Sequence, residues 1–166
     1  ESQDSFNDNE EQTLGSLIIS GDEAIEEKVG ESFGNDILPE GSPEEQYQFA
    51  FGLLRSQKFD EAKRAFEIFI DKNETHNLAG SANYWIGEII FLQGNYKEAA
   101  LTFAEGYQKY PESKKVADTL LKLSISLLKI NKNEQACITL NELINNYPES
   151  RLIDRANMEL KSSNCP

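Results

Sequence analysis

Apolar residues recur at three- and four-residue spacing from about residue 44 almost to the end of the chain, and the breaks between the apolar runs are short. This spacing gathers apolar side chains on one face of a helix, and the alternation typical of strands is absent from the sequence. The pattern predicts helices at about residues 44–56, 59–72, 77–92, 96–109, 114–130, 133–146 and 150–161. The predicted fold class is therefore all-α.

The helical region repeats with a period of 37 residues, because Phe59–Ala62, Tyr96–Ala99 and Asn133–Ala136 coincide when the chain is shifted by that length. Other positions of shared character coincide after the same shift: the small residues Ala50, Gly87 and Ser124, the apolar residues Leu53, Ile90 and Leu127, the alanines Ala62, Ala99 and Ala136, and the large apolar residues Phe66, Phe103 and Leu140. Pro111 and Pro148 also coincide, whereas the first copy has Glu74 there.

These classes of position have a physical interpretation. Small side chains at two points let the helices of a pair approach closely, and the large apolar residue fills the space beyond the contact. The two prolines end a helix because proline disfavours helical backbone at the preceding residue. Ser113 and Ser150 follow where the N-cap of the next helix is expected. The order of residue classes resembles the tetratricopeptide repeat (TPR), whose usual period is 34, so about three extra residues are expected in the connections of each repeat.

We therefore predict a TPR-like right-handed superhelix of three helix–turn–helix repeats, at about residues 44–76, 77–113 and 114–149, within a domain at 44–163. The helix at 150–161 would cap the third repeat. In such arrays the first helices of the repeats line an extended, rigid, concave surface. A surface of this kind suits a peptide or a helix of a partner protein.

Residues 1–43 differ sharply from the rest of the chain in charge. They contain twelve Asp or Glu residues against the single basic residue Lys28, whereas the remaining 123 residues contain seventeen acids and fifteen bases. We interpret residues 1–43 as an acidic, mostly disordered linker, because so polar a segment buries too little apolar surface to offset its ordering entropy. The apolar run Leu14–Ile19 and a possible short helix at Glu23–Val29 leave open the alternative that this segment docks on a partner.

The boundary of the folded region is marked by Pro39, Gly41 and Pro43, with Ser42 as a candidate N-cap. Beyond that boundary the chain is close to neutral, and no basic face indicates binding to nucleic acid. No apolar run approaches the roughly 18–20 residues of a membrane-spanning helix, and no basic amphipathic segment suits anionic lipid.

Candidate catalytic and metal-binding groups are scarce. His76 is the only histidine, and no nucleophile near it in the sequence would form a dyad with it. Two cysteines far apart in the sequence and one histidine argue against a zinc site, and glycine-rich phosphate loops are absent from the sequence. We expect no catalytic residues, no metal and no cofactor, and interpret the chain as a binding module and not an enzyme.

The predicted concave face is rich in aromatic and aliphatic residues. Tyr84 and Trp85 are adjacent, so they point about 100° apart on a helix. We expect Trp85 to pack between helices and Tyr84 to line the face. The predicted partner-binding residues are Tyr47, Phe51 and Leu54 in the first repeat, Tyr84, Glu88 and Phe91 in the second, and Leu121, Ile125 and Leu128 in the third. A large apolar patch usually marks an interaction site, although the acidic segment or the capping helix could cover part of it.

A closer resemblance lies in the strings Ala82–Glu88 (ANYWIGE), Gly94–Ala100, Tyr110–Lys115, Asp118–Leu123 and Tyr47–Leu54. They resemble the C-terminal TPR domain of the YbgF/CpoB family of Tol-Pal system proteins, and the resemblance spans about residues 44–160. Two positions depart from the family pattern, since Ser124 stands where a glycine is usual and Glu74 stands where the later repeats have proline.

The resemblance implies a soluble periplasmic protein of a Gram-negative bacterium. It implies binding to TolA and to a peptidoglycan synthase, in a role that coordinates wall synthesis with outer-membrane constriction during division. The family also has an N-terminal coiled coil that forms trimers. No heptad pattern occurs in residues 1–43, so we expect that element to be missing, and with it the means to form a homotrimer.

Cys137 lies on the second helix of the third repeat, and Cys165 follows the capping helix. The end of an antiparallel capping helix could fold back toward Cys137, a periplasmic location would permit a disulfide, and some members of the family are similar in carrying such a pair. A Cys137–Cys165 bridge would be worth roughly 3 kcal/mol in the chain-entropy model. The alternative is two free thiols.

A second functional hypothesis is a TPR lipoprotein subunit of the outer-membrane barrel-assembly machinery, whose members also stack TPR pairs of similar length. The discriminating feature is a lipidated cysteine at the mature N-terminus. The sequence begins with Glu1, and the sequence of the precursor would decide between the two hypotheses.

Overall fold

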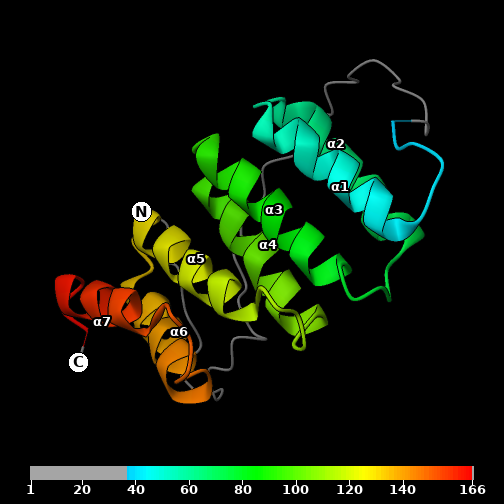
Figure 1. The fold of residues 1–166 in the computed structure, drawn as a ribbon. Coiled ribbons are helices and arrows are strands. Elements are labelled where there is room, and N and C mark those ends of the chain that lie inside the picture. Colours follow the sequence, from blue (N-terminus) through cyan, green and yellow to red (C-terminus); the bar gives the residue numbers. More distant parts are fainter. Residues whose placement is uncertain (1–36, 166) are drawn as a thin grey trace, which may run out of the picture.

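The computed structural model describes residues 37–165, and this part of the chain folds into helices with no strand among them. The helices are α1 (Pro43–Arg55), α2 (Phe59–Lys72), α3 (Ala79–Leu92), α4 (Tyr96–Lys109), α5 (Val116–Lys129), α6 (Asn133–Asn146) and α7 (Ile153–Ser162). Each helix packs against the next, so the helices follow one another in order from α1 at one end of the molecule to α7 at the other (Figure 1). The predicted all-α, TPR-like superhelical stacking is confirmed.

The connections repeat as regularly as the helices do. Three residues join the helices of each pair, at 56–58, 93–95 and 130–132, and six residues join successive pairs, at 73–78, 110–115 and 147–152. The middle residue of each three-residue connection is left-handed: Gln57, Gly94 and Asn131 have φ of 59°, 81° and 60°. Glycine and asparagine tolerate this conformation, whereas glutamine is strained in it. The repeat therefore extends to the backbone conformation of its turns.

Ser113 and Ser150 do not cap the helices that follow them, which corrects the sequence prediction. The N-cap residues of α5 and α7 lie two positions further along and make no side-chain capping bond. Each serine Oγ instead accepts a hydrogen bond from the backbone N–H two residues ahead, at 3.1 Å and 3.2 Å. His76, the equivalent residue one period earlier, accepts the same bond through Nδ1 at 3.2 Å. A turn separates these three side chains from the helix that follows. Their hydrogen bonds therefore stabilise the turn between repeats and do not cap the helix.

The small residues of the repeat lie where helices of a pair meet. A Cβ added to Gly87 in α3 would lie 2.5 Å from the ring of Phe103 in α4, so that the ring packs directly against the glycine backbone. Ala50 and Ser124, the equivalents of Gly87, are fully buried. Ala62, Ala99 and Ala136 are also fully buried. The predicted close approach is confirmed at Gly87, and the other five positions are fully buried.

The folded region begins earlier than residue 44. Leu38 is buried and belongs to the core cluster of α1–α4, with Ile37 packed beside it. Ser42 is the N-cap of α1, as predicted, and forms a capping box with Glu45. The Ser42 Oγ accepts from the Glu45 N–H at 3.2 Å, and the Ser42 N–H donates to the Glu45 carboxylate at 2.8 Å. The predictions for Leu14–Ile19 and Glu23–Val29 lie outside the described residues.

At the C-terminal end, α7 packs on α6 and covers the cluster of Leu120, Leu121, Leu140 and Leu143 with Ala156. Cys137 of α6 and Cys165, just after α7, are joined by a disulfide across a Cα–Cα separation of 5.6 Å. The bridge ties the end of the capping helix to the third repeat.

Candidate protein-binding face

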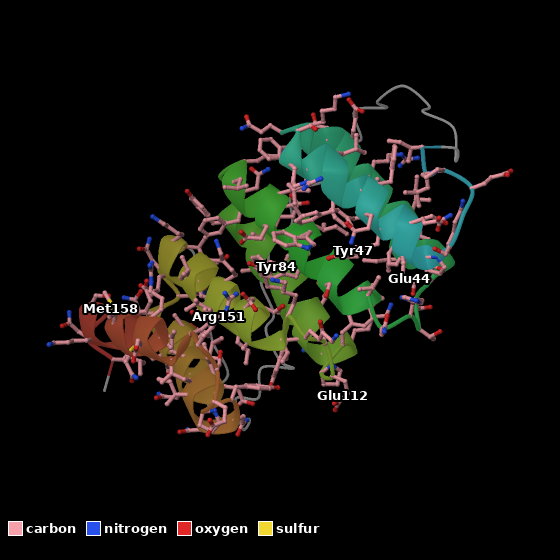
Figure 2. The ribbon with its side chains drawn as sticks, viewed as in Figure 1. Glu44, Tyr47, Tyr84, Glu112, Arg151 and Met158 are labelled. Carbon is pink, nitrogen blue, oxygen red and sulfur yellow. A yellow bond between two sulfur atoms is a disulfide. The ribbon has the colours of Figure 1, made fainter. Side chains whose placement is uncertain are left out.

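The first helices of the repeats, α1, α3 and α5, lie side by side as the inner face of the array. Between α1 and α3, the Trp85 Nε1–H donates to the Tyr47 hydroxyl at 2.8 Å, and the rings of Trp85 and Phe51 are 5.2 Å apart. Between α3 and α5, the Glu88 carboxylate lies 2.8 Å from the Lys122 ammonium. Figure 2 shows Tyr47 on α1 and Tyr84 on α3 in the middle of the molecule.

Tyr47, Tyr84 and Leu121 occupy equivalent positions and are buried, with exposures of 9%, 6% and 8%. Tyr47 packs edge-on against Phe66 of α2, and Tyr84 contacts Phe103 of α4. The expectation that these three side chains present an open surface is therefore wrong. Their place in the repeat directs them between the two helices of a pair, under the inner face.

The other predicted residues lie nearer the surface. Phe51, Glu88 and Ile125 form one class of equivalent positions, and Leu54, Phe91 and Leu128 form another. All six are half-buried, and the apolar ones pack against the edge of the core. They leave part of each side chain accessible to a partner, and their role in binding stays a prediction.

Trp85 packs between α1 and α3, as expected, whereas Tyr84 is buried and does not line the surface. Trp85 is half-buried and contacts α1 across the inner face, whereas Tyr84 is buried against α4. The two rings meet edge to face with centroids 4.9 Å apart. Burial raises the pKa of Tyr84 above its usual range, and the carboxylates of Glu88 and Asp118 raise it further. Tyr84 is thus neutral and buried, and its ring packs against that of the half-buried Trp85.

Three lysines of α5 and of the turn just before it lie over aromatic rings of the preceding repeat. The Lys115 Nζ is 5.1 Å from the ring centroids of both Tyr84 and Trp85. The Lys122 Nζ is 4.6 Å from the Phe91 centroid, and the Lys129 Nζ is 5.8 Å from that of Tyr96. We call these seven residues the lysine–aromatic wall. Ammonium groups at such distances are attracted to the ring faces, so each lysine is held against α3 or the start of α4.

The sequence prediction omitted the lysines, although a signal for them was present. They are seven residues apart, so they fall on one stripe of a helix. The face also carries carboxylates: Asp118 lies 4.0 Å from Lys115 and 3.5 Å from Arg151. The Glu88 Oε1 is buried and its approach to Lys122 lacks hydrogen-bond geometry, so the ammonium compensates this oxygen as an ion pair.

A depression of about 420 Å³ lies between the α2–α3 and α4–α5 connections. Its lining includes His76, Tyr110, Ser113 and the ion pair between Glu74 and Lys109. The His76 Nδ1 accepts from backbone and its Nε2 lies 3.2 Å from the Glu44 carboxylate, so both ring nitrogens serve the turn between repeats. Among the residues that line this depression, none is a nucleophile paired with the histidine.

Residues 37–165 contain no cluster of three or more His, Cys, Asp or Glu side chains arranged to hold a metal ion. Within the same range, no helix combines the length and the apolar character needed to cross a membrane. The inner face of α1, α3 and α5 is therefore the strongest candidate functional site.

Comparison with known proteins decides the family. Two family models described as tetratricopeptide repeat match residues 47–114 and 118–150, which together make up more than half of the chain. The chain belongs to the tetratricopeptide repeat family. The inner face of this TPR domain accordingly occupies the position that such arrays use to hold other polypeptides.

Two curated relatives are similar over a shorter stretch. Both carry the name cell division coordinator CpoB, one from Pseudomonas putida strain KT2440 and one from Pseudomonas putida. Each is 39% identical to this chain over 49 residues, which is 30% of this chain and 18% of the relative. The match thus spans less than a fifth of the length of these relatives.

Proposed function

We propose that this protein is a periplasmic TPR scaffold that holds a segment of an envelope protein on the inner face of α1, α3 and α5 and so coordinates cell-wall synthesis with division. The proposed partners are TolA and a peptidoglycan synthase. The observation that carries the proposal is a series of half-buried apolar side chains on the first helices of successive repeats, at Phe51, Trp85, Phe91 and Ile125. Such a surface buries apolar area without a change of fold when a peptide or helix docks on it.

Two further observations support the compartment and the process. The Cys137–Cys165 disulfide fits an oxidising compartment such as the periplasm, because disulfides rarely persist in the cytosol. The local similarity to CpoB, whose name describes a coordinator of cell division, favours a role in the same process.

The test is binding of purified TolA from the same organism to variants of the inner face, measured by titration calorimetry. Phe51→Ser and Phe91→Ser each remove a half-buried ring from the face. We expect each change to weaken binding about ten-fold or more, because truncating a central hot-spot side chain costs ~2 kcal/mol or more. Far-ultraviolet circular dichroism should be unchanged, since neither ring belongs to the fully buried core.

Phe49→Ser is the matched control. Phe49 lies on α1 and is 39% exposed, whereas its equivalents Ile86 and Leu123 are buried. Phe49 and Phe51 are two positions apart, about 200° around the helix, so Phe49 lies on the side of α1 opposite Phe51. Equal binding by all three variants would move the site elsewhere, and absence of TolA and synthase binding by the unaltered protein would overturn the proposed partners.

A further inference from the structure

We propose that the lysine–aromatic wall binds the acidic N-terminal segment of the same chain, residues 1–36, so that this segment and a partner protein compete for one surface. The proposal goes beyond the scaffold function, because it concerns the state of the face when no partner is bound.

The wall presents more positive than negative charge. Lys115, Lys122 and Lys129 recur every seven residues along α5, which spaces them about 10 Å apart along the helix. The side chains of Lys115 and Lys122 are 27% and 25% exposed, and Lys129 is exposed. Each ammonium lies over a ring, and part of each lysine side chain stays open to solvent. Of the acidic groups nearby, Glu88 and Asp118 are the carboxylates that contact these lysines.

The N-terminal segment has the complementary composition. Residues 1–36 contain eleven acidic residues against Lys28, and five of the acids fall within Asp22–Glu31. The run Leu14–Ile19 supplies apolar side chains that the half-buried rings of Trp85 and Phe91 can contact. Because the rest of the chain is close to neutral, no other stretch matches the wall so well in charge.

The segment can reach the wall from its point of attachment. Ile37 and Leu38 pack against the core beside α1, and the wall lies on α3 and α5. Neighbouring helices are about 10 Å apart, so the distance to cover is roughly 20 Å. The roughly 6–15 residues between Asp22–Glu31 and Ile37 span about 20–50 Å when extended. A tether of this length gives a local concentration of about millimolar, enough to favour contacts that are individually weak.

Trp85 makes the proposal directly measurable, because it is the only tryptophan in the chain and lies in the wall. The measurement is quenching of its fluorescence by acrylamide, a neutral quencher that reports steric cover. The test variant carries Asp22→Asn, Glu23→Gln, Glu26→Gln, Glu27→Gln and Glu31→Gln in the full chain. At low salt we expect its quenching constant to be about two-fold higher than that of the unaltered protein. Raising salt to about 0.5 M should remove the difference, because ions screen the attraction.

The matched controls separate the wall from general charge effects. Lys115→Gln with Lys122→Gln and Lys129→Gln should raise quenching as the acidic variant does. Lys72→Gln with Lys97→Gln and Lys161→Gln removes the same charge from exposed positions on α2, α4 and α7 and should leave quenching unchanged.

Equal quenching of the unaltered protein and the acidic variant at low salt would overturn the proposal, whatever the result with TolA. The acidic variant changes only residues outside the described fold, so a loss of folding in the lysine variant would not obscure that result. Protection that disappears on dilution, together with a dimer by sedimentation, would assign the contact to a second copy and would also overturn it.

Discussion

The two ends of the array are held together by different means. The cluster formed by α1–α4, with residues of α5 and Ala136 of α6, is built around fully buried rings, Phe66, Phe69 and Phe103, with Tyr47 and Tyr84 packed against them. The cluster of α5, α6 and α7 has leucines at its centre and is the smaller of the two. A covalent bridge from Cys137 to Cys165 closes that end.

The difference indicates where each end gains its stability. Large rings bury much apolar surface and meet in edge-to-face pairs, so the N-terminal cluster needs no cross-link. The capping helix α7 is ten residues long and has one fully buried residue, Ala156. So short a helix gains little stability from burial. The disulfide stabilises this end instead, because it lowers the conformational entropy of the unfolded chain.

The largest expected effect comes from a substitution in the ring-rich cluster toward the N-terminal end of the array. Phe103→Ala should lower the free energy of unfolding by about 4 kcal/mol, because the ring is fully buried and lies against both Gly87 and Tyr84. The equivalent change at the aliphatic end, Leu140→Ala, should cost about 3 kcal/mol. Urea denaturation of the two variants measures both values. A larger loss for Leu140→Ala would contradict the contrast between the two ends.

The next largest effect is expected from removal of the disulfide at the C-terminal end of the array. Replacing both Cys137 and Cys165 with serine should cost about 3 kcal/mol, since the unfolded chain regains the freedom that the closed loop removes. Hydrogen exchange should rise chiefly in α7 and in the first turns of α6 around Cys137, and hardly in α1–α4. The matched comparison is each single serine variant, which breaks the same bridge. Exchange that rises evenly from α1 to α7 would show that the bridge supports the whole array.

The smallest effect concerns the turn in which the first repeat differs from the others. Glutamine, unlike glycine or asparagine, is strained at the left-handed φ of 59° that Gln57 adopts. Gln57→Gly should therefore raise the free energy of unfolding by up to about 1 kcal/mol. Gly94→Ala, at the equivalent turn of the second repeat, should lower it by about 1 kcal/mol. Thermal unfolding followed by circular dichroism compares the two. A destabilising Gln57→Gly would show that the glutamine side chain contributes more than its backbone costs.

The fold was predictable because the same pattern of residue classes occurs in three successive repeats. Periodicity located the helices, and the coincidence of Ala50, Gly87 and Ser124 located the contacts between them. The direction in which an individual side chain points was harder to predict. A separation of about 100° between Tyr84 and Trp85 shows that they point differently, but it does not show which of them meets the neighbouring helix.

The candidate site was predictable only in part, for similar reasons. The helices of the inner face follow from their order in each repeat, but the lysines over the rings depend on long side chains that reach across to another helix. Ser113 and Ser150 have the residue type of an N-cap, and only the backbone shows that a turn comes first. The place of Cys165 beside Cys137 depended on the direction taken by a short tail after α7.

The exposure of Phe49 indicates the end of the solenoid at which further repeats would be added. Ile86 and Leu123 are buried, whereas Phe49, the equivalent residue of α1, is exposed to solvent. A further helical pair placed ahead of α1 would find a docking position already shaped by the register of the other repeats. At the opposite end the tethered α7 occupies the corresponding position, so added repeats would extend the array from the α1 side.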